Sequence, residues 1–515
     1  MAERNGLNFS GKGMSLSKLY QSISSSTSPQ KFYNQQQKEL SKLLSSASET
    51  AFGKAHHFED ILAQNDLVTA FQKAVPVRSY EEMKEWWGRA LKGESDVVTK
   101  GRLEYFALSS GTSDGASKYV PVSKKQMSQF KRQSVKLSLR IALNKDIPAS
   151  VFSKHHLLIG GSMDLNYNGV SYTGDLSGIT QLKIPFWYQP FSKPGREVMR
   201  MQWDNKIENI VRDAPEWNIS IITGVPSWVQ IVLERIIERY KLKHIHDLWP
   251  ELKVYIHSGI RAEPYINSIN GLFGEKVYWY ESYLASEGFF AFKQSDTATG
   301  MKLILSDNNF FEFIPFNAEN FDNAGNIKPG ALALTIKDVA AETDYALLIT
   351  TCSGAWRYLI GDMVRFTDVS KAEITVSGRT KHFLSVTGEH LSVDNMNKAI
   401  ELVSNKLGFV CKEFTVHAEK DGNQFIHVWY IGCDKIVDAL QLKSSLDDKL
   451  MELNDDYRTE RGYALKDIRV ITVPNDMFYN FLRQRGKAGG QVKFPRVLKD
   501  ELLMAWQDFV KSPVV

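Results

Sequence analysis

The sequence predicts an α/β protein with two domains: a large N-terminal domain of layered sheets and helices, and a smaller α+β C-terminal domain. The chain has 515 residues, too many for one hydrophobic core, so more than one domain is expected. From about residue 100 onward, short apolar runs alternate with amphipathic helical segments, which indicates α/β layers with ligand loops near the sheet edges. A break in this pattern around residues 367–381 precedes a compact set of further elements.

The first expected elements are N-terminal helices, followed by short strands. Between about residues 15 and 62, Leu, Tyr and Phe recur at helical spacing among Ser- and Gln-rich stretches. Further along, the stretch PSWVQIVLERIIERYKL predicts a helix over residues 226–242. Short apolar runs predict strands at HHLLIGG (155–161), ISIITG (219–224), KVYIHSG (253–259) and ALLITT (346–351).

The elements after the break form the predicted C-terminal domain. Helices are expected from about residue 392 and near 434–454, where one core-facing stripe holds Leu442, Leu446, Leu450 and Leu453. Strands are expected at FTVHAE (414–419), QFIHVWYIG (424–432) and IRVITVP (468–474). We therefore divide the chain into domains at residues 1–378 and 379–515, with a hinge near Arg379.

The composition is that of an ordinary globular protein. There are 63 basic and 59 acidic residues, and the resulting charge of +4 is too small to indicate a nucleic-acid or anionic-membrane partner. No apolar run approaches the roughly 20 residues that span a bilayer. The first 20 residues contain no apolar core of a signal peptide, so a cytoplasmic location is expected. The three cysteines lie far apart in the sequence, which argues against a disulfide framework and a zinc site.

A loop of small polar residues separates two apolar segments in EYFALSSGTSDGASKYVPVS (104–123). Gly, Ser and Asp favour turns for local reasons, so a hairpin turn and a phosphate-binding loop both explain this composition. The loop is not a P-loop, because its second glycine comes four residues after the first and Lys118 follows three residues later. A P-loop also opens a helix, whereas these flanks predict strand, loop and strand.

Three further stretches carry groups suited to nucleotide chemistry. In YESYLASEGFF (280–290), Ser286 and Glu287 offer a hydroxyl and a hard oxygen ligand for Mg²⁺, although a strand end with a surface Glu has the same pattern. In GAWRYLIGDMVRF (354–366), Asp362 follows an apolar run, where its carboxylate either takes two ribose hydroxyls or sits in a simple turn. SGRTKHFLSVTGEHLS (377–392) places Arg379 at the predicted domain break.

In this order and spacing, these stretches resemble the signature motifs of the adenylate-forming superfamily, which includes acyl-CoA ligases and luciferases. SSGTSDGASK is similar to its phosphate loop, YLASE to its aromatic-to-Glu motif, YLIGD to its ribose-binding motif and GRTKHFLSVTGEHL to its hinge motif. Within the superfamily, SSGTSDGASKYVPV, YLASE, RYLIGDMV and VKFPRV (492–497) resemble the auxin-responsive acyl acid amido synthetase family. ETAFGKAHHFEDI and FQKAVPVRSYEEMKEW are similar to the N-terminal region of its bacterial-type members, so the resemblance spans nearly the whole chain.

The resemblance implies a large adenylate-forming domain, a mobile C-terminal domain, and a requirement for ATP and Mg²⁺. The residues that would hold phosphate oxygens are Ser109, Ser110, Gly111, Thr112 and Ser113. Tyr283 would stack on adenine, and Ser286 would touch the α-phosphate. Glu287 would ligate Mg²⁺ and so act in catalysis. Asp362 would bind the ribose, and Arg379 would reach the ribose or the phosphates.

The catalytic lysine and the acid-binding pocket are each assigned from two candidate residues. The segment RQRGKAGGQVKFPRV (483–497) offers Lys493, which matches the amido synthetase pattern and is preferred, and Lys487, which resembles the GK of the wider superfamily. Trp228 and Arg261 lie near strand ends before the YLASE motif, where they are candidates for contacting the ring and the carboxylate of the acid. Core packing of the tryptophan and a surface ion pair of the arginine are the alternatives.

The predicted function is an ATP-dependent ligase that activates a small carboxylic acid as an acyl-adenylate and transfers the acyl group to the amine of an amino acid. Two alternatives stay open: an acyl-CoA ligase with coenzyme A as the acceptor, and a non-catalytic nucleotide-binding module. Glu287, Asp362 and a C-terminal lysine together argue against the module, because sensing ATP needs no catalytic lysine. Lys381 and Trp356 depart from the residues common in relatives, which weakens any inference that the acid resembles a plant hormone.

Overall fold

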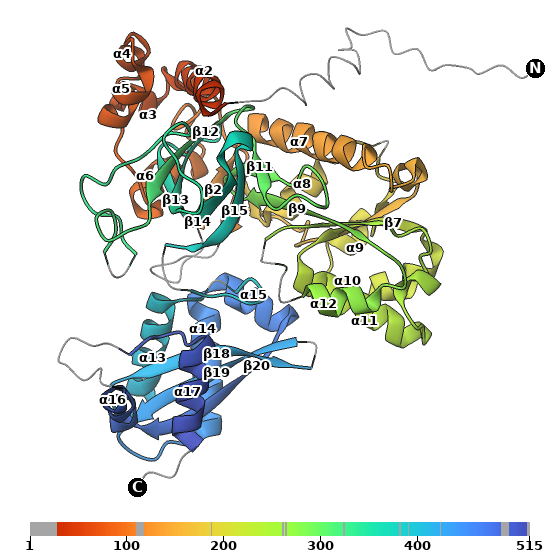
Figure 1. Cartoon of the computed structure of the whole chain (residues 1–515), viewed down its shortest axis with the longest axis vertical. Helices are drawn as coiled ribbons and strands as arrows, with labels where there is room; N and C mark the ends of the chain where they lie inside the picture. The colour runs from red at the N-terminus through yellow and green to blue at the C-terminus, as the bar shows by residue number, and fades with distance from the viewer. Residues whose placement is uncertain are drawn as a thin grey trace, which may run out of the picture.

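The protein folds into a large body and a smaller C-terminal unit (Figure 1). The computed structural model describes residues 28–109, 118–186, 188–259, 262, 265–322, 325–380, 383–389, 391–422, 424–485 and 494–511. The body is built on an 11-stranded sheet with a four-stranded sheet beside it, and the C-terminal unit on a three-stranded sheet. This arrangement confirms the predicted α/β class with a smaller α+β unit at the C-terminal end.

The large sheet joins a parallel half to an antiparallel half, in the order β12-β13-β14-β15-β11-β10-β9-β8-β7-β3-β6. The parallel half contains β9 (Tyr278–Ala285), β8 (Val254–His257), β7 (Ile219–Gly224), β3 (His155–Ile159) and β6 (Ser192–Lys193). The antiparallel half adds β10 (Gly288–Phe292), β11 (Met301–Leu303), β12 (Asn309–Pro315), β13 (Asp344–Thr351), β14 (Tyr358–Asp368) and β15 (Glu373–Arg379). Every residue of β8 is buried, as expected for a parallel strand covered on both faces.

The four-stranded sheet has the order β2-β1-β5-β4. Its strands are β1 (Tyr105–Ser109), β2 (Lys118–Val122), β4 (Asn166–Tyr167) and β5 (Tyr172–Gly174). β1 and β2 pair antiparallel, with Ser109 opposite Lys118. The predicted strand, loop and strand around residues 104–123 are therefore confirmed at both flanks, and β2 leads directly into a long helix, α7 (Lys124–Ala142).

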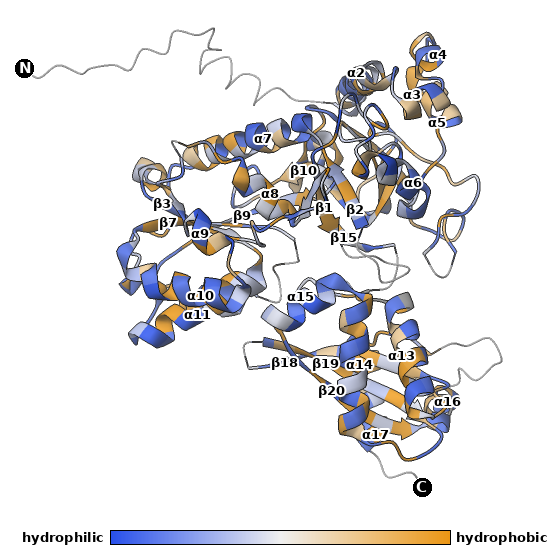
Figure 2. Cartoon of the chain, turned by 180° about the vertical axis from the view of Figure 1, so that it is seen from behind, coloured by the Kyte–Doolittle hydropathy of each residue, from blue (hydrophilic) through white to orange (hydrophobic). Residues whose placement is uncertain are grey.

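The helices of the body cover these sheets. Those before the first strand are α2 (Pro29–Ala47), α3 (Ala51–Ala55), α4 (Phe58–Leu62), α5 (Leu67–Ala74) and α6 (Tyr80–Leu91). Those that follow α7 are α8 (Leu176–Leu182), α9 (Arg196–Met199), α10 (Trp203–Asp213), α11 (Pro226–Tyr240) and α12 (Ile266–Leu272). In Figure 2, α10 and α11 carry both hydrophilic and hydrophobic residues, the pattern of helices with one face in the core and one in solvent.

The C-terminal unit packs helices on the sheet β18-β19-β20. Its strands are β18 (Phe414–Asp421), β19 (Gln424–Cys433) and β20 (Leu465–Pro474), preceded by a hairpin of β16 (Phe383–Leu384) and β17 (Leu391–Ser392). Its helices are α13 (Val393–Leu407), α14 (Ala439–Leu453), α15 (Asp455–Tyr463), α16 (Asn475–Gln484) and α17 (Asp500–Lys511). The predicted leucine stripe faces the core, because Leu442, Leu446 and Leu450 on α14 are fully buried.

The predicted elements are present in the described part of the chain, most of them with ends that differ by up to three residues, and two predictions differ more. Residues 15–27 of the predicted N-terminal helices lie outside the described residues. Most of residues 367–379 is regular structure: the end of β14, a 3₁₀ turn (Val369–Lys371) and β15, so the chain leaves the large sheet only after Arg379, near the end of the predicted break. The helix expected from residue 434 begins at Ala439, because the Asp438 carboxylate caps its first backbone N–H groups. In the described part of the chain, no helix is both long and apolar enough to cross a bilayer.

Candidate functional site

Three of the predicted nucleotide-binding residues meet at the junction of the two halves of the large sheet. The Tyr283 hydroxyl donates a 2.6 Å hydrogen bond to Asp362 Oδ2, and Arg379 Nε lies 2.9 Å from Asp362 Oδ1. Asp362 and Arg379 are register partners in neighbouring strands, β14 and β15. The side chain of Asp362 is 9% exposed and that of Arg379 is 31% exposed, so Arg379 is the most exposed of the three residues.

The contact between Tyr283 and Asp362 depends on the curvature of the sheet. Three strands, β15, β11 and β10, separate β14 from β9 in the strand order. In a flat sheet, four spacings of about 4.8 Å would hold these two strands roughly 19 Å apart. A 2.6 Å hydrogen bond between them therefore requires the sheet to curl strongly at this point.

The Tyr283 ring itself is buried in the core of the body. It packs edge-on against Phe290, with ring centroids 5.3 Å apart, and is 8% exposed. Its hydroxyl is committed to Asp362. The stacking of this ring on adenine stays a prediction, whereas the contact of its hydroxyl with the expected ribose ligand was not anticipated from the sequence.

Ser286 and Glu287 form the two-residue connection between β9 and β10. This position is the carboxyl end of a parallel strand, where α/β folds commonly bind ligands. Glu287 is 7% exposed, and burial raises the pKa of its carboxyl to about 7, although the nearby Lys118 lowers it. The carboxylate is thus held in a site whose described residues compensate its charge only in part.

The expected phosphate loop is only partly within the described residues. Ser109 ends β1, and Ser110, Gly111, Thr112 and Ser113 lie outside the residues that the structure describes. Lys118, which begins β2, has its ammonium 5.4 Å from the centre of the Tyr80 ring. Its charge acts on Glu287, so the end of the loop and the β9–β10 turn lie close together.

Trp228 lies between the body and the C-terminal unit. It is on α11, and its ring contacts those of Trp203 and Tyr463, with centroids 5.2 and 5.5 Å away. Its indole N–H points at Glu460 Oε2 on α15, 3.5 Å away, and burial raises the pKa of Glu460 well above its usual value. The predicted contact of Trp228 with the acid stays a prediction, and Arg261 lies outside the described residues.

The segment after Arg379 also contacts the body. Tyr265 donates a 2.8 Å hydrogen bond to the carbonyl of Val386, and Ser227 donates one of 3.3 Å to the carbonyl of Thr387. Lys487 and Lys493, the two candidates for the catalytic lysine, both lie outside the described residues. The choice between them is therefore unchanged.

The sequence reasoning missed the residue that contacts the Ser286 backbone. Gln126 on α7 donates a 2.9 Å hydrogen bond from its Nε2 to the carbonyl oxygen of Ser286. A signal for it was present, because Gln126, Gln129 and Gln133 are spaced so that they share the buried face of a helix. Polar residues at core-facing positions need hydrogen-bond partners, so such a pattern points to specific contacts.

Two of the histidines make hydrogen bonds within the fold of the body. His156 is half-buried between the Tyr188 hydroxyl (2.8 Å) and the Thr223 hydroxyl (2.7 Å), and desolvation of the ring lowers its pKa to about 4. His246 bonds the carbonyl of Leu252 at 2.9 Å. Within the described ranges, no group of three or more His, Cys, Asp or Glu side chains is arranged to hold a metal ion.

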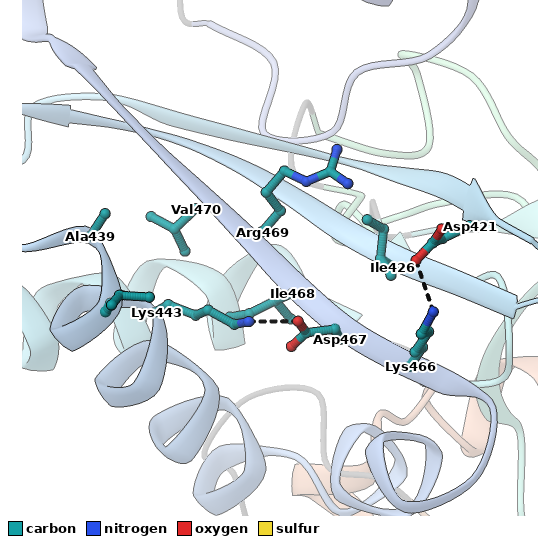
Figure 3. Close-up of a pocket in the computed structure, with 10 residues that line it drawn as sticks. Asp421, Ile426, Ala439, Lys443, Lys466, Asp467, Ile468, Arg469 and Val470 are labelled. Carbon is teal, nitrogen blue, oxygen red and sulfur yellow. Dashed lines mark hydrogen bonds and ion pairs between the residues drawn. The ribbon is translucent and has the colours of Figure 1, made fainter.

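A surface pocket of about 330 Å³ lies in the C-terminal unit, between α14 and the strands β19 and β20 (Figure 3). Its two lysines are engaged: Lys443 pairs with Asp467 at 2.5 Å, and Lys466 with Asp421 at 3.1 Å. Arg469 pairs with a glutamate of β18 at 3.2 Å. Each of these cations is paired with a carboxylate, so the pocket has little positive charge left to attract an anion. It contains none of the predicted site residues.

Comparison with known proteins identifies related chains over most of the length of this chain. Three family models match in order: the GH3 family N-terminal domain at residues 28–162, the central domain at 302–379 and the C-terminal domain at 394–502. Together they cover more than half of the chain. A curated relative, 4-substituted benzoates-glutamate ligase GH3.12 of Arabidopsis thaliana, is 21% identical in an alignment that covers 83% of this chain and 87% of the relative.

Two solved structures share the fold. The GH3.15 acyl acid amido synthetase in complex with 2,4-DB has a TM-score of 0.58 at 17% identity and covers 96% of each chain. A 2-hydroxyisobutyryl-CoA ligase in complex with 2-HIB-AMP and CoA has a TM-score of 0.59 at 14% identity, with 92% of this chain and 91% of that chain covered. The predicted fold, with its large and small parts, is confirmed by these likenesses.

Proposed function

Because the chain belongs to the GH3 family, we propose that it is an ATP-dependent ligase that activates a small carboxylic acid as an acyl-adenylate and transfers the acyl group to the amine of an amino acid. Relatives named as amido synthetases and ligases support this reaction class. The observation that carries the proposal is the meeting of Tyr283, Asp362 and Arg379, because these residues belong to the YLASE, YLIGD and hinge motifs respectively.

The reaction needs no nucleophile from the protein. A carboxylate oxygen of the acid attacks the α-phosphorus of ATP, the bond to the β-phosphate oxygen breaks, and pyrophosphate leaves. The amine then attacks the acyl carbon, loses a proton and displaces AMP. Both steps depend on in-line positioning and on neutralising the phosphate charge, which fixed cations and hydrogen-bond donors supply.

We assign the nucleotide to the curled junction of the large sheet. Asp362 would take the ribose hydroxyls, and its two protein partners leave carboxylate lone pairs for them. Arg379, the partly exposed member, would reach the ribose or the phosphates. Tyr283 would orient Asp362 through its hydroxyl, in addition to the stacking predicted for its ring. The phosphates would meet Ser109 and the loop that follows it.

Glu287 fits the role of a Mg²⁺ ligand. Mg²⁺ is commonly held by one or two carboxylates together with substrate phosphates, so a site with a single protein carboxylate is chemically adequate. The raised pKa of Glu287 supports this assignment, because a buried carboxylate short of positive partners gains from a cation. When bound, Mg²⁺ would neutralise phosphate charge, and Glu287 would hold it beside the Ser286 backbone.

We propose a domain boundary at residues 378/379, with the C-terminal part rotating between adenylation and acyl transfer. The departure of the chain from the large sheet after Arg379 supports this boundary. Lys493 would enter the site for adenylation. A hinge at the end of a strand concentrates the backbone change in a few residues, as in other enzymes that close over a substrate.

The test is acid-dependent exchange between ATP and pyrophosphate, over a panel of aromatic, indole and aliphatic carboxylic acids, without amine or coenzyme A. Exchange with one class of acid is expected and would establish adenylation. A second step compares amino acids with coenzyme A as acceptors of the acyl group. Release of AMP with coenzyme A alone would replace the amido synthetase by an acyl-CoA ligase, and ATP binding without any exchange would favour a sensor.

A further inference from the structure

A chain of buried polar side chains ends at the β9–β10 turn. Gln126 lies in the first turn of α7 and is 1% exposed. Its Nε2 donates to the carbonyl of Ser286 at 2.9 Å, and its Oε1 accepts a short hydrogen bond from the hydroxyl of Ser353. The oxygen of that hydroxyl in turn accepts the backbone N–H of Ser123 at 2.9 Å.

This chain connects three segments that are far apart in the sequence. Ser123 directly follows β2, the strand that leaves the predicted phosphate loop, and is the N-cap of α7. Ser353 comes just after β13, and Ser286 immediately precedes Glu287. Gln126 thus ties the backbone beside the expected Mg²⁺ ligand to the strand that leads away from the expected phosphate loop.

Packing alone does not require a glutamine at this position. Methionine has nearly the same length and shape and would fill the buried space without needing hydrogen-bond partners. A buried carboxamide, by contrast, is costly unless both of its ends are paired. Both ends of Gln126 are paired, and one of the two partners is the backbone of the predicted catalytic turn.

We propose that Gln126 is a positioning residue that holds the Ser286–Glu287 turn, and with it the Glu287 carboxylate, in the place where Mg²⁺ and ATP bind. This inference rests on the proposed function. Residues that orient a metal ligand commonly matter almost as much as the ligand, because a ligand that moves freely must be ordered again each time the metal binds. Gln126 acts through the backbone of Ser286 and needs no contact with the substrates.

The test compares Gln126→Met with Gln133→Met in the full chain. Gln133 is a matched control, because it is equally buried on the same helix but donates to the Asp307 carboxylate. In Gln126→Met, the Mg²⁺ concentration for half-maximal ATP–pyrophosphate exchange should rise about 10- to 100-fold, the usual cost of losing a residue that orients a metal ligand. The exchange rate at saturating Mg²⁺ should stay near that of the parent, as should every parameter of Gln133→Met.

A second readout does not depend on turnover. Binding of Mn²⁺ to the chain with a non-hydrolysable ATP analogue, followed by electron paramagnetic resonance, should weaken by a similar factor in Gln126→Met. Ser353→Ala should weaken it less, and should add little in the Gln126→Met background, because both residues act through one chain of hydrogen bonds. Gln126→Glu, which keeps the shape and can still accept from Ser353, provides the same comparison if the methionine variant unfolds.

Unchanged metal dependence in either folded Gln126 variant would overturn the inference, and so would an equal loss in Gln133→Met. Failure of the proposed function has a different signature. If the parent binds the Mn²⁺–nucleotide complex but exchanges no pyrophosphate, the ligase proposal fails while the metal-binding comparison still decides the role of Gln126. If the parent binds no such complex, both proposals fail.

Discussion

Replacing Tyr283 by phenylalanine separates the two roles that this residue has in our account. The change removes one oxygen atom and keeps the ring, so any stacking on adenine is preserved. Asp362 loses its 2.6 Å hydrogen bond but keeps its contact with Arg379. A hydrogen bond to a charged group contributes about 1.5–3 kcal/mol, which corresponds to about 10- to 150-fold in affinity if that bond orients the carboxylate for the ribose.

The assay measures the KM for ATP in pyrophosphate exchange and the affinity for a non-hydrolysable ATP analogue by calorimetry. Tyr280→Phe is the matched control, because Tyr280 is on the same strand and fully buried, and its hydroxyl contacts Asn144 at 3.3 Å. Tyr283→Phe should weaken nucleotide binding and Tyr280→Phe should not. In an Asp362→Asn background, Tyr283→Phe should have little further effect, because the two residues act together.

Tyr283→Leu then tests the ring. If the ring stacks on adenine, the leucine variant should lose about 1–3 kcal/mol beyond the phenylalanine variant, the usual contribution of stacking on a base. Nucleotide affinity equal to the parent in Tyr283→Phe would refute the orienting role of the hydroxyl. Equal affinity in the phenylalanine and leucine variants would refute the stacking predicted from the sequence.

Three further changes have defined outcomes. Arg357→Met leaves the Glu312 carboxylate buried without its bidentate partner, so the free energy of unfolding measured in urea should fall by about 3–5 kcal/mol. A fall of less than about 1 kcal/mol would contradict the importance of this pair. Burial between the two parts raises the pKa of Glu460. The contact between the parts is therefore fully stable below the pKa of an ordinary glutamate, and it weakens as pH rises through the raised pKa of Glu460 in the folded protein. Glu460→Gln should abolish this pH dependence, measured as the distance between the two parts by energy transfer between dyes. Lys493→Ala should slow adenylation about 10²–10³-fold with nucleotide affinity nearly unchanged, and the same loss in Lys487→Ala instead would move the role to that lysine.

Short apolar runs in the sequence predicted strands well, because the residue types in such a run themselves favour a buried strand. The run ISIITG is β7 residue for residue, because β-branched residues in a short apolar run favour a buried strand. The break expected at residues 367–381 is mostly a hairpin connection and a strand, and the chain leaves the sheet only at its end. A polar hairpin connection and a domain linker have the same local composition, and only the pairing of β15 with β14 distinguishes them.

The sequence by itself determined the order of the motifs, the family they indicate and the residue types available for ATP chemistry. Only the tertiary structure decided which of these residues meet. Tyr283 reaches Asp362 because the sheet curls across three intervening strands, and Gln126 reaches Ser286 because α7 packs beside the β9–β10 turn. Periodicity reports which face of an element is buried, but it has no information on how far apart two elements lie once the sheet has curled.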